Sequence, residues 1–138
     1  MLPHSQYAVK SVMKVLKFGG SSLRDAEAIR RCVALVRDAR ESGPVTVVCS
    51  AVGGVTDSLI SAARMAETGN DGYQQAFRDL QSRHQQICEA LGLTPKIDIE
   101  LTELLSELAQ LLHGVSLIRD CSRRTMDLLL SFGERLSC

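Results

Sequence analysis

Two short apolar runs, each followed by a pair of glycines, constrain the fold of this chain more than any other feature. The first run, residues 13–18, stops at Gly19 and Gly20, and the second, residues 45–50, precedes Gly53 and Gly54. Apolar runs of this length that end at turn residues are typical of buried strands. Between them, hydrophobic residues recur every three or four positions: Leu23, Ala26, Ile29, Val33, Val36 and Ala39. This order of strand, helix and strand predicts a right-handed parallel βαβ unit.

The rest of the chain has a helical pattern. A first helix is expected to start at Thr56 and to stop at the turn residues 69–72. A second is expected over residues 73–91, with Gly92 as its stop. A third is expected over residues 97–113, ending before Gly114, with a leucine stripe at Leu101, Leu104, Leu105, Leu108 and Leu112. Two shorter pieces should follow, the last starting near Gly133. The fold class is therefore α/β with a helix-rich second half.

Composition limits the classes of function. The 138 residues are 45% hydrophobic and 23% charged, which suits one globular core. Sixteen basic residues balance sixteen acidic ones, so no basic excess points to nucleic acid or an anionic membrane surface. No run approaches the roughly 18 apolar residues of a membrane span. The five cysteines are odd in number, scattered and without metal-ligand spacing, which favours reduced thiols in a cytoplasmic protein and gives a metal site little support.

The two ends of the sequence also carry expectations. Residues 1–12 contain no apolar block, so they are interpreted as an N-terminal extension or leader, with Met13 as the candidate native start. Two parallel strands are too few for a stable sheet, and the sequence ends inside a predicted helix. We therefore expect residues 13–138 to be the N-terminal part of a truncated domain, which would hide its open sheet edge by self-association.

The first chemical motif spans residues 17–22 at the predicted strand-to-helix turn. Gly19 and Gly20 let backbone N–H groups approach an anion, and a helix N-terminus after them would add its positive dipole end. Lys17, at the carboxyl end of the strand, could place its ammonium against phosphoryl oxygens. The order differs from a Walker A loop and from a dinucleotide-binding loop. The alternative is a plain glycine turn beside a solvated lysine.

The second motif follows the neighbouring strand. Parallel strands deliver their carboxyl ends to the same edge of a sheet, so the two glycine loops should face one crevice, where open α/β sheets bind ligands. The hydroxyls of Ser50 and Thr56 could bond a small polar substrate there. The alternative is that either residue is a simple helix N-cap, which for Thr56 is the favoured interpretation.

The third motif covers residues 131–137. Glu134 is predicted at a helix start, where the helix dipole alone would favour a carboxylate. The functional alternative is that Glu134 accepts hydrogen bonds from a substrate ammonium. His84 and Cys88 lie four residues apart on one helix face, but no third ligand is near in sequence, so core packing is the expected role of both.

Together, Lys17-Phe-Gly-Gly-Ser-Ser22, residues 47–56 and Ser131-Phe-Gly-Glu-Arg-Leu-Ser137 resemble the three motifs of the aspartate kinase branch of the amino-acid kinase family, in order and over residues 13–138. Ser21 stands where that branch more often has threonine, which preserves the hydroxyl. Residues 112–118 further resemble the bifunctional aspartate kinase–homoserine dehydrogenases.

The resemblance implies a three-layer sandwich around a mainly parallel sheet and ATP-dependent phosphorylation of the β-carboxylate of L-aspartate, the first step toward lysine, threonine and methionine. It implies that Lys17, Gly19, Gly20 and Ser21 contact the transferred phosphate. It implies that Ser50, Thr56 and Glu134 bind aspartate, with Glu134 at the α-ammonium. Most of the site for ATP and Mg²⁺ would lie beyond residue 138, so the chain alone is expected to be inactive. A homo-oligomer is expected, with no nucleic-acid or membrane partner.

Other classes remain open at the level of sequence. Another kinase of the same fold, such as a relative that acts on glutamate or carbamate, would share the glycine loops but not the 131–137 motif. A helical interaction module would not need two glycine loops and Lys17. A dinucleotide-binding oxidoreductase would need a third glycine and an acidic residue at the end of its second strand, and the chain has neither.

Overall fold

The first part of the chain forms the predicted parallel strand pair. The computed structural model describes residues 12–138, so the predicted N-terminal extension lies outside the described residues except for Val12. Strands β1 (Lys14–Phe18) and β2 (Val45–Cys49) pair in parallel, with Phe18 opposite Cys49. Helix α1 (Ala26–Arg40) connects them, and its N-cap is Asp25, whose carboxylate accepts the Ala28 N–H at 2.7 Å. The predicted α/β fold is confirmed.

The two strands are more exposed than their apolar sequences indicate. Phe18 packs with Leu23 and Cys32 on the face that α1 covers. Side chains alternate along a strand, so Val15 and Lys17 point to the other face; Val15 is 63% exposed and Val48 of β2 is 43% exposed. The prediction of two buried strands is wrong, because a parallel sheet is buried only where helices cover both faces, and among residues 12–138 only one face is covered.

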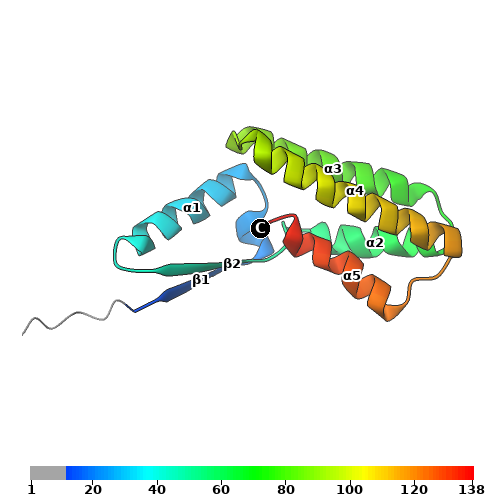
Figure 1. The fold of residues 1–138 in the computed structure, drawn as a ribbon, viewed down its shortest axis with the longest axis horizontal. Helices are drawn as coiled ribbons and strands as arrows, with labels where there is room; N and C mark the ends of the chain where they lie inside the picture. Colours follow the sequence, from blue (N-terminus) through cyan, green and yellow to red (C-terminus); the bar gives the residue numbers. More distant parts are fainter. Residues whose placement is uncertain (1–11) are drawn as a thin grey trace, which may run out of the picture.

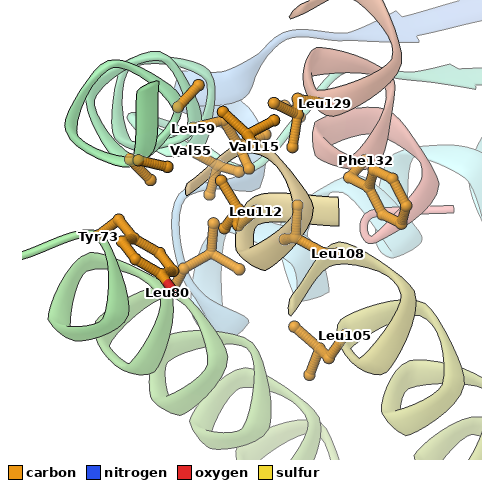
Figure 2. Packing of buried hydrophobic residues seen from close by; sticks show 14 of the residues in the cluster. Val55, Leu59, Tyr73, Leu80, Leu105, Leu108, Leu112, Val115, Leu129 and Phe132 are labelled. Atoms are coloured by element: carbon orange, nitrogen blue, oxygen red, sulfur yellow. The ribbon is translucent and has the colours of Figure 1, made fainter. Parts of the chain in front are cut away.

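The second part is a bundle of four helices. It lies beside the strands (Figure 1). The four helices are α2 (Val55–Glu67), α3 (Gly72–Leu91), α4 (Pro95–Ile118) and α5 (Arg123–Arg135). The leucine stripe of α4 lies in the core as predicted, where Leu108 is 0% and Leu112 1% exposed. Figure 2 shows these leucines facing side chains of the other three helices. Within residues 12–138, every helix falls short of the length and apolarity that crossing a bilayer requires.

Two of the predicted helix boundaries are wrong. Helix α4 continues through Gly114 to Ile118, because the next buried position, Val115 at 2% exposure, contributes more than the roughly 1 kcal/mol that a glycine costs inside a helix. The last helix does not start near Gly133. It starts at Arg123, where the Ser122 side chain accepts the Thr125 N–H, and Gly133 lies near its end.

One polar side chain is buried at the boundary between the two parts. His84 of α3 is 3% exposed, and its Nδ1 lies 2.8 Å from the carbonyl oxygen of Leu80. A carbonyl can only accept, so Nδ1 carries the hydrogen. Nε2 has no hydrogen-bond partner among the described residues, and the ring borders a mainly apolar cavity of about 570 Å³ between the βαβ part and helices α3 and α4. Burial lowers the pKa of His84.

The buried imidazole predicts a loss of stability in mild acid. Its native pKa is below that of the unfolded chain, so the unfolded state binds the extra proton and the free energy of unfolding falls as pH drops below about 6.5. While the native ring stays neutral, each pH unit costs up to about 1.4 kcal/mol. Urea titrations between about pH 7.5 and 5.5 should show a shallower pH dependence for His84→Leu than for the wild type. Equal slopes would contradict this account.

Candidate active site

The two glycine loops touch each other through their backbones. A Cβ placed on Gly53 would lie only 2.8 Å from the carbonyl oxygen of Gly20. A Cβ placed on Gly20 would lie 3.0 Å from the carbonyl oxygen of Ala51 and 3.2 Å from the Cα of Gly53. Only residues without a side chain allow this approach. The loops after β1 and β2 therefore form one edge, as the parallel pairing predicts.

The first loop differs from expectation in the element that follows it. Gly20–Leu23 is a single 3-10 turn, closed by a hydrogen bond from the Ser22 N–H to Gly19, and α1 begins only at Ala26. The first amides of α1 are capped by Asp25. The predicted dipole contribution of a helix directly after the glycines is thus wrong. Lys17, Gly19 and Ser21 are exposed at this edge. A Cβ placed on Gly19 would have no heavy atom of another residue within 4 Å, apart from its chain neighbours.

The N-cap of α2, which follows the second loop, is not the residue predicted from the sequence. Gly54 occupies the N-cap position with φ of 83°, and the N-cap offers no side-chain hydrogen bond to the helix. Thr56 is exposed in the first turn, so its prediction as an N-cap is wrong and its hydroxyl is not committed to capping. Ser50 is half-buried and donates its N–H to the Phe18 carbonyl at 3.0 Å.

The end of α5 packs against the second loop. A Cβ on Gly133 would lie 2.9 Å from the Cβ of Ala51 and 3.9 Å from Oγ1 of Thr56. The hydroxyl of Ser137 donates to the carbonyl oxygen of Ser50 at 2.7 Å. Three segments separated by up to about a hundred residues thus meet around Ala51, which is 3% exposed. The sequence interpretation did not single out Ala51, although a small residue between a strand and a glycine loop was a usable signal.

The position of Glu134 rules out the helix dipole as the reason for a carboxylate here. It lies in the last turn of α5, so the prediction of a helix start is wrong. A carboxylate at a helix C-terminus faces the negative end of the dipole, which is unfavourable. Glu134 is exposed and joins no ion pair with residues 12–138, whereas its neighbour Arg135 pairs with Glu107 at 2.9 Å.

No three His, Cys, Asp or Glu side chains of residues 12–138 gather as metal ligands. Each site residue predicted from the sequence can now be located. Lys17, Gly19, Gly20 and Ser21 lie at the first loop, and Ser50 and Thr56 lie at the second, which Gly20 contacts. Glu134 follows Gly133, which packs on Ala51 of the second loop. The contacts link the three segments, so the sequence motifs are brought to one region.

Comparison with known proteins gives a consistent result. The family model described as the amino acid kinase family matches residues 13–138. Aspartokinase 1, chloroplastic, of Arabidopsis thaliana is 33% identical over 131 residues, which are 93% of this chain and 22% of that protein. The aspartokinase of Chlamydia trachomatis is 33% identical over 89% of this chain and 25% of its own length. The crystal structure of E. coli aspartokinase III with lysine and aspartate is 28% identical, with a TM-score of 0.78 over 91% of this chain and 27% of that chain. The chain thus spans about a quarter of the length of each of these three proteins.

The glycine contact can be tested by adding one methyl group. Gly53→Ala forces a Cβ to within 2.8 Å of the Gly20 backbone, so the free energy of unfolding should fall by about 1–3 kcal/mol. Gly19→Ala is the matched control, because Gly19 has open space and an extended backbone with φ of −82°. The control should be neutral or stabilising by up to about 1 kcal/mol. Equal effects in denaturant titrations would show that the loops do not touch as described.

Proposed function

The chain belongs to the amino acid kinase family, and on that premise we propose that it is the N-terminal part of the catalytic domain of an aspartate kinase. The reaction transfers the γ-phosphoryl group of ATP to the β-carboxylate of L-aspartate. The observation that carries the proposal is the meeting of the three motif segments around Ala51. The similarity to aspartokinases over about nine-tenths of the chain supports it, as does the fact that the E. coli relative was crystallised with aspartate and ADP.

In this proposal the first loop faces the phosphate. An oxygen of the aspartate side chain attacks the γ-phosphorus while the bond to the leaving ADP oxygen breaks. Charge on the phosphoryl oxygens is then offset by the ammonium of Lys17 and by the amides of Gly19 and Gly20, with the Ser21 hydroxyl beside them. Phosphoryl transfer depends mainly on such positioning and charge stabilisation.

The second and third segments hold the acceptor. Thr56 and Ser50, both in the second loop region, each offer a hydroxyl for the aspartate carboxylates. Glu134 accepts hydrogen bonds from the α-ammonium, a role that accounts for an exposed carboxylate at the unfavourable end of a helix.

We propose that ATP and its Mg²⁺ are held mostly by parts of the complete kinase that this chain does not include. The chain spans 22% of Aspartokinase 1 and 27% of the E. coli structure, and no cluster of metal ligands occurs in residues 12–138. Mg²⁺ neutralises charge on the phosphate oxygens when bound. Activity of the chain alone is therefore not expected.

The decisive assay is aspartate-dependent release of ADP by the complete kinase that carries this chain. Lys17→Met should lower kcat by about 10²–10³ without a change in melting temperature, because its loss removes a charge that is needed only in transfer. Lys14→Met is the control. Lys14 lies at the amino end of the same strand, away from the glycine loops, and donates a hydrogen bond to Ser42, so this variant should keep the wild-type turnover.

Three further arms of this assay test the proposal. The 138-residue chain alone should release no ADP. Faster release with glutamate or carbamate as acceptor would favour the other kinases of this fold. Wild-type turnover of Lys17→Met with an unchanged melting curve would remove Lys17 from the mechanism.

Glu134→Gln separates substrate binding from stability. The aspartate KM should rise by about tenfold or more, since a hydrogen bond to a charged group contributes about 1.5–3 kcal/mol, while the ATP KM stays constant. The melting temperature should stay the same or rise slightly, because the helix C-terminus loses an unfavourable charge. Asp127→Asn, an exposed carboxylate earlier on α5, is the control and should change neither KM. Equal increases in both KM values would contradict the role of Glu134.

A further inference from the structure

One side chain from the helical part reaches both glycine loops. Arg83 of α3 donates a hydrogen bond from Nη2 to the carbonyl oxygen of Arg24 at 3.0 Å, across 59 residues of sequence. Arg24 directly follows the 3-10 turn of the first loop. The contact therefore ties the backbone at the end of the first loop to a helix of the bundle.

The same guanidinium lies beside the second loop. Its Nη1 is 3.7 Å from the point where a Cβ on Gly54 would stand. Arg24 also borders this loop, since its Cβ is 3.4 Å from the Cβ position of Gly53. One planar group with five donors in a fixed geometry is thus hydrogen-bonded at the end of the loop after β1 and lies beside Gly54 in the loop after β2.

Helix α3 is a rigid base for this contact. Leu80 and His84, on either side of Arg83, are 6% and 3% exposed. The first loop is also held by the packing of Leu23 with Phe18 and Cys32. Its other attachments are the Gly20–Gly53 approach, the Ser22–Gly19 bond and a Cys32 thiol that donates to the Ser22 carbonyl at 3.2 Å. The hydrogen bond from Arg83 adds a restraint that connects this loop to a helix anchored in the core.

We propose that Arg83 is a positioning residue that holds the two glycine loops in the register needed for phosphoryl transfer. This inference rests on the proposed kinase function for its catalytic consequence. Arg83 acts through its hydrogen bond to the Arg24 carbonyl and its position beside Gly54, and it does not itself contact the reacting atoms. A displacement of about 1 Å in a catalytic group can cost about a hundredfold in rate, so one lost restraint has a measurable effect.

The restraint is measured first on the 138-residue chain, by amide hydrogen exchange. In Arg83→Met, the amides of Ser22 and Val55, which donate hydrogen bonds within the two loops, should exchange about three- to tenfold faster, the range expected for one lost hydrogen bond. Arg83→Lys keeps a cationic donor and should exchange at rates nearer to the wild type. Arg78→Met, which removes an arginine of α3 bonded only to Gln75 on the same helix, should leave these amides unchanged.

The outcomes of that experiment decide the positioning role. Faster exchange confined to the two loops, with the α3 amides unchanged and partial rescue by lysine, supports it. Unchanged loop amides, or an equal increase over all helices, would overturn it, because the second result is general destabilisation.

The catalytic consequence is measured in the complete kinase. Arg83→Met should lower kcat by about ten- to a hundredfold at an unchanged melting temperature, and Arg83→Lys should restore part of it. Unchanged kcat in Arg83→Met would overturn the catalytic role. If the complete wild-type protein phosphorylates no aspartate, the proposed function fails, while the exchange experiment still decides whether Arg83 positions the loops.

Discussion

The backbone contact between Gly20 and Gly53 is the constraint on which the site depends. Any Cβ at these positions would come within about 3 Å of the other loop, so the loops can meet only as glycines. Parallel pairing of β1 and β2 brings the two loops to the same edge, and the contact then fixes their separation. Ala51 extends the same packing to the third segment, where Gly133 again leaves no room for a side chain. Small residues without charge, the glycines and Ala51, therefore determine how the segments that carry Lys17 and Glu134 meet.

Much of the fold follows from local sequence patterns, whereas exceptions such as Gly133 depend on contacts between residues far apart in the sequence. The strand positions were predictable from short apolar runs that end at glycines, and most helices from apolar periods that are visible over many residues. Glycine was the least predictable residue. Gly69 and Gly92 end helices with positive φ, as their sequence positions indicate, but Gly114 and Gly133 continue theirs. At Gly133 a side chain would collide with Ala51, so the position must be glycine. Ala51 lies about eighty residues away in the sequence, so no local pattern reveals this requirement.

The same distinction applies to the site. Lys17 and the glycine loops could be predicted because strand order alone places them at one edge. Thr56 and Glu134 were predicted as site residues, but the structural roles weighed against this, an N-cap and a helix start, were wrong. Neither the N-cap at Gly54 nor the true start of α5 has a strong local signal in the sequence. Both corrections strengthen the functional interpretation, because they leave a hydroxyl and a carboxylate without a local structural purpose. Arg83 could not be found, because its partner Arg24 is 59 residues away and the reach of a long side chain has no sequence period.

The exposure of Lys17 bears on how the proposed chemistry can operate. Lys17 lies on the strand face with Val15 and Val48, which no helix of residues 12–138 covers. In water a charge pair 4 Å apart contributes only about 1 kcal/mol, whereas at the effective dielectric constant near a protein surface it contributes about 4 kcal/mol. In the proposed reaction, Lys17 therefore stabilises the transferring phosphate more strongly where protein, and not bulk water, surrounds the pair. The uncovered apolar residues around Lys17 are consistent with such a protein environment, because valines on a strand face favour contact with a packed layer over contact with water.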